Sequence, residues 1–171
     1  NSGGPKPGTF DALDEAAFRD AADLLLLNVV RATKAFLPLM RAGGRGGRII
    51  AITSVSVREV MPNLILSNSL RGAVAGWAKT LSRELGGDGI TVNNVLPGYT
   101  RTQRLDQILA DRSAATGKPQ DEIAKGMLAS VPVGRFADAG EIGGVIAFLC
   151  TQAAAYVNGQ SLAVDGGRMQ S

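Results

Sequence analysis

Two polar residues, Ser67 and Arg71, stand four positions apart in a segment whose small and apolar residues recur at helical spacing, residues 67–85. Residues four apart lie on the same face of an α-helix, so the hydroxyl and the guanidinium are predicted to project into the same space. A hydroxyl and a planar donor fork can hydrogen-bond an oxyanion or a ribose diol. The alternative interpretation is a small helix residue beside a solvated cation.

Two apolar segments predict strands that bring further polar residues to the same place. RIIAITSVS, residues 48–56, stops in serines and should carry Ser54 at its carboxyl end. TVNNVLPG, residues 91–98, should be a second strand ended by Pro97 and Gly98. With the helix between them, these strands favour a parallel crossover, whose ligands bind beyond the carboxyl ends. Ser54 and the PGYTRT segment are therefore expected at one functional edge, although each could also be an ordinary turn.

The rest of the chain continues this alternation of helices and strands. A helix is predicted from Asp14 to Met40, with or without a break, and a mixed helical region, interrupted at TGKPQ, over residues 101–129. Another helix should begin at Ala139, and GQSLAVDGG should form a last short strand. This order predicts an α/β layered fold with a parallel sheet.

Composition excludes several classes of function. The 171 residues are 45% hydrophobic and 19% charged, which fits one globular domain, residues 1–171. The net charge of +3 is too mild and too dispersed to imply nucleic acid. With no histidine and one cysteine, Cys150, neither a usual zinc site nor an internal disulfide is expected. Cys150 lies in an apolar stretch and is predicted to be buried.

Targeting signals are not expected. The longest apolar run, residues 24–30, is too short to span a bilayer, and no basic-then-apolar leader opens the sequence. We therefore expect a cytoplasmic protein with no membrane partner. The chain begins with Asn1 rather than methionine, and its first predicted strand follows a long helix, which suggests a fragment.

Five pieces of sequence follow one another along the chain: NSGG, LLNVVRATKAFLPLM, Ser54, VNNVLPGYTRT, and VPVGRFADAGEIGGVIAFLC followed by YVNGQSLAVDGG. Through them the chain resembles, from end to end, the short-chain dehydrogenase/reductase family, and within it the 3-oxoacyl-acyl-carrier-protein reductases. NSGG resembles the Asn-Ala-Gly loop after the family's fourth strand, Asn28 in LLNVVRATKAFLPLM matches the family's helix asparagine, and Ser54 matches its catalytic serine. VNNVLPGYTRT is similar to the segment that touches nicotinamide. VPVGRFADAGEIGGVIAFLC and YVNGQSLAVDGG are similar to the C-terminal signature.

The resemblance implies the C-terminal two-thirds of a Rossmann-like, doubly wound parallel sheet with flanking helices. It also implies an oxidoreductase that uses NAD or NADP on a carbonyl or alcohol of a small molecule. The family's glycine-rich phosphate loop and the residues that choose between NAD and NADP would precede Asn1. Family dimers and tetramers imply a homodimer or homotetramer, with which apolar Trp77, Leu81 and Phe148 are consistent, although a core would use them equally well.

The family's catalytic Tyr-x-x-x-Lys is replaced in this chain. The tyrosine should follow the serine by thirteen residues, which is the position of Ser67, and the lysine position is Arg71. The resemblance thus implies the catalytic set Asn28, Ser54, Ser67 and Arg71. It implies the cofactor-binding set Asn1, Gly3, Arg71, Pro97, Gly98, Thr100 and Thr102.

The replaced pair changes the chemistry that can be expected. A serine is a far weaker acid than a phenol, and arginine, with a pKa above roughly 12, cannot shuttle a proton near neutrality. Ser54, Ser67 and Arg71 are therefore expected to orient a carbonyl and stabilise an oxyanion, while water near Asn28 delivers the proton. Asn28 itself should need a local hydrogen bond inside its helix, which could be purely structural. The competing hypothesis is an inactive member that serves as a binding or assembly module.

Overall fold

The middle strand of the sheet is the most buried segment of the protein, as its apolar sequence predicts. The computed structural model describes residues 3–170, and its three strands are parallel in the order β1-β2-β3. The strands are β1 (Gly47–Ile52), β2 (Ile90–Pro97) and β3 (Ser161–Val164). Ile52 lies opposite Val95, which lies opposite Leu162. The predicted α/β fold and the parallel crossover are confirmed.

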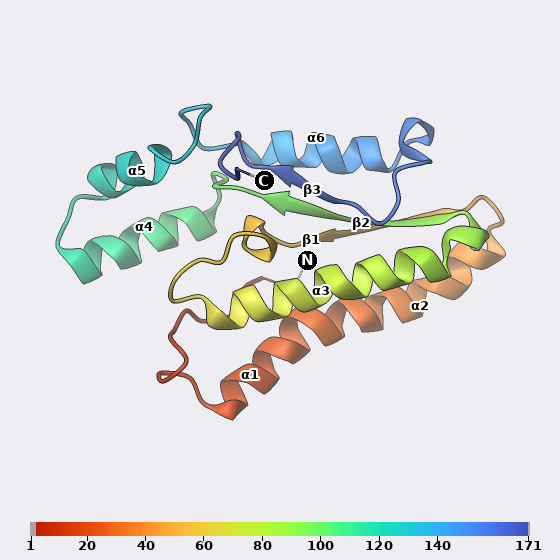
Figure 1. Ribbon diagram of the computed structural model, residues 1–171, viewed down its shortest axis with the longest axis horizontal. Helices are drawn as coiled ribbons and strands as arrows, with labels where there is room; N and C mark the ends of the chain where they lie inside the picture. The colour runs from red at the N-terminus through yellow and green to blue at the C-terminus, as the bar shows by residue number, and fades with distance from the viewer. Residues whose placement is uncertain (1–2, 171) are drawn as a thin grey trace.

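Helices cover both faces of this sheet (Figure 1). The helices α1, α2 and α3 lie on one face and α6 on the other, while α4 and α5 extend beyond the carboxyl ends of the strands. Their bounds are α1 (Glu15–Ala22), α2 (Asn28–Ala42), α3 (Ile65–Glu84), α4 (Gln103–Thr116), α5 (Gln120–Leu128) and α6 (Ala139–Leu149). The predicted interruption at TGKPQ separates α4 from α5.

Alternate residues of the strands supply two hydrophobic cores. Ile90 and Val92 of β2 pack with Ala78 and Leu85 of the α3 side. Val95, three residues further along β2, points to the other face and packs with α6 residues. This alternation follows from the two-residue period of a strand and fixes α3 and α6 on opposite faces.

The long N-terminal helix is interrupted just before Asn28. Asp14 caps α1 by accepting a hydrogen bond from the Ala17 N–H at 2.9 Å. A π-helical turn, Asp23–Leu27, then joins α1 to α2, and the Asn28 N–H donates to the Asp23 carbonyl. Such a turn inserts one extra residue into the helix and shifts the faces that follow it.

One burial prediction is wrong. Cys150 is exposed, because it follows the last residue of α6 and is rotated away from Leu149, which faces the sheet and is 1% exposed. One step along a helix turns a side chain by about 100°. Among residues 3–170, no helix is long and apolar enough to cross a membrane.

Candidate active site

The carboxyl edge of the sheet carries several of the residues that the sequence predicts to be functional. Ser54 lies two residues beyond the end of β1, and Gly98 directly follows β2. Because the two strands are parallel and paired up to Ile52 and Val95, the loops after them leave the sheet at the same edge. The prediction that Ser54 and the PGYTRT segment share this edge is confirmed.

Ser54 begins a short 3-10 turn, Val55–Val57. Its backbone is extended, and its hydroxyl oxygen accepts a hydrogen bond from the Ser56 N–H at 3.1 Å. The turn that the alternative interpretation invoked is therefore present. Because the hydroxyl only accepts in this contact, its own O–H remains able to donate to another oxygen.

Ser67 and Arg71 contact each other on α3. The Arg71 Nε–H donates to the Ser67 hydroxyl oxygen at 3.1 Å, so the prediction that both project into one space is confirmed. The contact places a positive charge directly on the serine oxygen. A hydroxyl whose oxygen accepts from a cation is a stronger donor through its own O–H, because hydrogen bonds in a chain polarise one another.

The rest of the Arg71 guanidinium binds backbone carbonyls. Nη1 donates to the Thr53 carbonyl at 3.0 Å and to the Ile52 carbonyl at 3.4 Å, and Nη2 donates to the Gly3 carbonyl at 3.2 Å. Together with Ser67, these acceptors engage four of the five N–H groups that an arginine carries. Arg71 therefore ties α3 to the end of β1 and to the N-terminal loop.

The environment of Arg71 disfavours its charge. Burial lowers the pKa of its guanidinium, and the positive charge of Arg104 lowers it further. An arginine nevertheless stays protonated in a protein near neutrality. The site is therefore positive, and it acts through hydrogen bonds and charge rather than through a titrating arginine.

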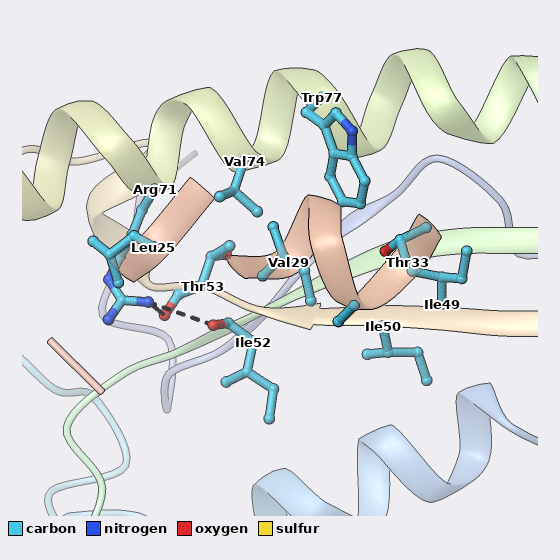
Figure 2. Close-up of a pocket in the computed structure, with 12 residues that line it drawn as sticks. Leu25, Val29, Thr33, Ile49, Ile50, Ile52, Thr53, Arg71, Val74 and Trp77 are labelled. Carbon is cyan, nitrogen blue, oxygen red and sulfur yellow. Dashed lines mark hydrogen bonds between the residues drawn. The ribbon is translucent and has the colours of Figure 1, made fainter. Parts of the chain in front are cut away.

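An apolar cavity of about 160 Å³ adjoins this pair, between α2, β1 and α3. Figure 2 shows Arg71 and Thr53 at one end of it and Trp77 toward the other, with Val29 and Val74 between them. Ligand pockets usually have about 300–1,000 Å³. A molecule as large as a nicotinamide nucleotide therefore does not fit within this cavity, and the polar edge beside it is the better candidate site.

The loop after β2 is built by its own side chains. The Thr100 hydroxyl donates to the Gly98 carbonyl at 3.2 Å, and the Thr102 hydroxyl to the Thr100 carbonyl at 3.4 Å. A Cβ atom at Gly98 would lie only 2.7 Å from the Asp165 Cα. The glycine is thus required by the close approach of the loops after β2 and β3, whatever ligand the edge binds.

Comparison with known proteins identifies the family. A family model described as enoyl-(acyl carrier protein) reductase matches residues 1–168. The chain belongs to the short-chain dehydrogenase/reductase family. It is 34% identical over 169 residues to the 3-oxoacyl-[acyl-carrier-protein] reductase FabG of Escherichia coli, covering 98% of this chain and 64% of that protein.

Solved structures of short-chain dehydrogenases/reductases share its fold. The NADPH-dependent reductase YwfH, involved in bacilysin biosynthesis, superposes with a TM-score of 0.93 at 28% identity, covering 100% of this chain and 65% of YwfH. The L-sorbose reductase of Gluconobacter frateurii, solved with NADPH and L-sorbose, has a TM-score of 0.93 at 26% identity over 100% of this chain and 65% of that one. The chain thus spans somewhat less than two thirds of these relatives.

One residue predicted for the family's site, Asn28, is not joined to it by a side-chain hydrogen bond among the described residues. Asn28 is exposed, and its side chain makes no hydrogen bond to another described residue. The prediction that it forms a local hydrogen bond inside its helix is therefore wrong. Its neighbours Leu25 and Val29 line the cavity instead. Asn1 lies outside the described residues, while Gly3 contributes a carbonyl rather than a side chain.

The structure also brings together three residues that sequence analysis missed. The Arg168 guanidinium lies 5.0 Å from the centroid of the Tyr99 ring, and its Nη2 is 3.3 Å from Glu59 Oε1. Glu59 and Arg168 are 109 positions apart in the sequence. No spacing rule predicts such a contact, although Tyr99 belongs to the PGYTRT segment that the sequence places at this edge.

Metal ligands do not gather in the described part of the chain. Among residues 3–170, no group of three or more His, Cys, Asp or Glu side chains could hold a metal ion. The polar groups around Arg71 are the Ser67 hydroxyl, the backbone carbonyls of Gly3, Ile52 and Thr53, and the guanidinium itself. The hydroxyl and guanidinium groups among them can donate hydrogen bonds to a carbonyl oxygen or an anion.

Proposed function

We propose that the protein is an NAD(P)-dependent oxidoreductase that acts on a carbonyl or alcohol of a small molecule. Its catalytic set is Asn28, Ser54, Ser67 and Arg71, with Ser67 and Arg71 in place of the family's tyrosine and lysine. The observation that supports this proposal is that the Arg71 guanidinium binds both the Ser67 hydroxyl and the carbonyl of Thr53, the residue before Ser54. Both serines and a cation are thereby held at the edge of the sheet where parallel α/β folds bind ligands. The match to the family over residues 1–168 supports the same function.

The two hydroxyls are suited to orienting a carbonyl group. Ser54 and Ser67 each accept one hydrogen bond, from the Ser56 N–H and from Arg71 Nε. Neither donates to another described residue, so each O–H can donate to a substrate oxygen. As charge grows on that oxygen during reduction, the nearby guanidinium stabilises it. Fixed donors of this kind are each worth about 2.7–4 kcal/mol in the transition state.

The residues present fit the nicotinamide end of a dinucleotide. The loop after β2 offers backbone and threonine oxygens at the edge, and Arg71 keeps one Nη2 N–H that is not engaged by the described residues. Pro97, Gly98, Thr100 and Thr102 would hold the ring, while Arg71 and Gly3 would face the ribose. When bound, the nucleotide supplies or accepts the hydride.

Proton transfer is assigned to water in this proposal. Neither a serine hydroxyl nor an arginine titrates near neutrality, so neither serves as the general acid. Asn28 is exposed, and its amide can both donate to and accept from a water molecule. It would thus hold water beside the helix that lines the cavity, and Ser54 and Ser67 would only orient the oxygen that receives the proton.

A second candidate function is a binding or assembly module without turnover. It is favoured by the same arginine, because four of the five Arg71 N–H groups already bind the protein's own acceptors. An arginine used in this way is a cross-link between α3, β1 and the N-terminal loop. Turnover measurements decide between the two functions.

Nucleotide binding is the first test. The protein in its full natural length is titrated with NADH and with NADPH while nicotinamide fluorescence is followed. We expect a saturable change with at least one nucleotide, and weaker binding in Thr102→Val. Thr116→Val, at the far end of α4, is the matched control and should bind as the unaltered protein does. A protein that changes the fluorescence of neither nucleotide contradicts the proposal.

We further propose that the chain forms the C-terminal two-thirds of its domain and that the protein is a cytoplasmic homodimer or homotetramer. Apolar side chains exposed on α2 support association, since Phe36 is 58% and Leu39 is 68% exposed. Sedimentation of the unaltered protein and of Leu39→Glu tests this. A monomer at micromolar concentration contradicts the oligomer.

A further inference from the structure

The segment after β3 folds back over the carboxyl edge because of an Asp-Gly-Gly turn. The Asp165 carboxylate accepts hydrogen bonds from the N–H groups of Gly167 at 3.0 Å and Met169 at 2.8 Å. Gly166 has a φ of +67°, a conformation that favours glycine, and a Cβ there would lie 2.8 Å from Val131 Cγ1. The backbone on both sides of Arg168 is therefore fixed by hydrogen bonds.

The Arg168 side chain is buried although it carries a charge. It is 9% exposed, and Glu59, its partner in the ion pair, is 51% exposed. The guanidinium stacks 5.0 Å from the Tyr99 ring centroid. Arginine on an aromatic face gains a cation–π attraction, which is stronger in a desolvated site.

The hydrogen bonds of this arginine are incomplete. Its Nε and Nη1 atoms are buried and have no hydrogen-bond partner among the described residues. A buried cation with unfilled donors lowers stability, because desolvation costs more than the remaining contacts return. Packing alone would favour an apolar residue at this position. The charge of Arg168 is better explained by its contacts with Glu59 and Tyr99, which lie in two different loops.

These contacts connect the loops after all three strands. Glu59 lies in the loop after β1 that contains Ser54, Tyr99 lies in the loop after β2, and Arg168 itself follows β3. A single guanidinium therefore spans the carboxyl edge. It touches neither serine, nor Arg71, in the described contacts.

We propose that Arg168 is a positioning residue, which holds the Ser54 loop through Glu59 and the PGYT loop through Tyr99 in the arrangement that binds the nicotinamide nucleotide. The inference rests on the proposed function for its ligand. The joining of the two loops, however, is a property of the protein without any ligand. The two parts can therefore be tested separately.

Hydrogen exchange tests the joining of the loops. Deuterium uptake of the full natural-length protein is measured by mass spectrometry for peptides that cover residues 53–64 and 97–102. We expect Arg168→Gln to raise uptake in both peptides. Arg83→Gln, which removes an exposed arginine from the last turn of α3, is the matched control and should raise neither. Unchanged uptake in Arg168→Gln, or a rise in only one peptide, overturns the proposal.

Steady-state kinetics test the positioning role. We expect Arg168→Gln to raise the KM for the nucleotide about tenfold, the size of one lost hydrogen bond to a charged group, with kcat within about twofold. Glu59→Gln should do the same through the Ser54 loop, and the double variant should be no worse than either single variant. Arg168→Lys keeps the charge, so its KM for the nucleotide should rise less than that of Arg168→Gln. Equal KM values in all variants overturn the role.

The outcomes distinguish this inference from the proposed function. If the unaltered protein binds neither NADH nor NADPH, the proposed function fails, and with it the nucleotide role of Arg168, whatever the exchange data show. If it binds and Arg168→Gln alters neither exchange nor KM, only this inference fails. If Arg168→Gln does not fold, hydrogen exchange and the KM for the nucleotide are measured on Arg168→Lys and Glu59→Gln instead.

Discussion

Two polar clusters on the same sheet differ in how many of their hydrogen-bonding groups have partners within the protein. The first, which we call the amide lock, comprises Asn93, Asn158 and Gln160 near the start of β3. Asn93 donates to the Val157 carbonyl at 2.8 Å and accepts from the Gln160 N–H at 3.0 Å. The nitrogen and the oxygen of the Asn93 side-chain amide are thus both hydrogen-bonded to the backbone.

Asn158 completes the amide lock in the same manner. Its oxygen accepts from the Val92 N–H at 2.9 Å, and its nitrogen donates to the Ser82 carbonyl at 2.9 Å. Neutral side chains with two filled hydrogen bonds stabilise a structure and leave little for a ligand. The amide lock therefore fixes β3 against β2 and α3.

The carboxyl edge holds charged side chains and unfilled donors instead. Among residues 3–170, two buried nitrogens of Arg168 have no hydrogen-bond partner, and the hydroxyls of Ser54 and Ser67 donate to no other residue. Unfilled donors next to a positive charge lower stability but can bind an oxygen of a ligand. In these two clusters, the amides of Asn93 and Asn158 are filled by the backbone, whereas the hydroxyls of Ser54 and Ser67 keep an O–H that donates to no described residue.

The largest effect on stability is expected in the amide lock. Asn93 is 1% exposed, and Asn93→Leu leaves the Val157 carbonyl and the Gln160 N–H unpaired. We expect the free energy of unfolding in urea to fall by about 3 kcal/mol, with unchanged nucleotide affinity of the folded protein. Gln160→Ala, which removes one exposed contact of 3.1 Å, is the control and should cost far less. A stable Asn93→Leu protein with altered nucleotide affinity would reverse the comparison.

Removing the Ser67 hydroxyl should act more on turnover than on stability. Ser67→Ala deletes one donor to the substrate oxygen, and we expect kcat to fall about 10²-fold. The free energy of unfolding should fall by about 1 kcal/mol, because the Nε–H of Arg71 loses its acceptor. Ser69→Ala, an exposed neighbour on α3, should keep full activity. If Ser67→Ala unfolds readily and retains its kcat, Ser67 belongs with the structural cluster.

The smallest effect concerns the exposed ion pair of Arg135 with Glu141. Arg135 binds both Glu141 oxygens at 2.7 Å, and the Asp138 N–H donates to Glu141 as well. The hydrogen bonds from Arg135, and then from the Asp138 backbone, lower the pKa of Glu141 to about 2. Because the folded-state pKa lies below the ordinary value of 4.5, the carboxylate stabilises the fold above pH 4.5.

That contribution should be lost as the pH falls through about 2, since the unfolded chain binds the proton first. Urea unfolding at several pH values between 2 and 6 measures it. The unaltered protein should lose more stability over this range than Glu141→Gln, which has no carboxylate to titrate. Identical slopes would show that the pair contributes nothing, as many exposed ion pairs do.

Local sequence pattern predicted the elements and the pair on α3. Helical spacing over residues 67–85 placed Ser67 and Arg71 on one face, and their 3.1 Å contact follows from that spacing. Apolar runs ending in Ser54 and in Pro97 predicted two strands and their common edge. Each of these inferences needs only neighbours within one helical turn or one strand.

Contacts across the fold could not be predicted in this way. The acceptors of Arg71 are the carbonyls of Gly3, Ile52 and Thr53, and every residue has a carbonyl, so sequence gives no signal for them. The Arg168 contacts join three separate loops, and the exposure of Cys150 depends on which face α6 turns to the sheet. All of these follow from tertiary packing.

The most direct test of the central claim is turnover of a ketone by the full natural-length protein, compared with Ser67→Tyr/Arg71→Lys. We expect the natural protein to reduce the ketone while oxidising NADH or NADPH, and the double variant to be slower. The variant lacks both the contact between residues 67 and 71 and the arginine contacts to the end of β1. No turnover by the natural protein, with activity gained by the double variant, would contradict it and show an inactive site.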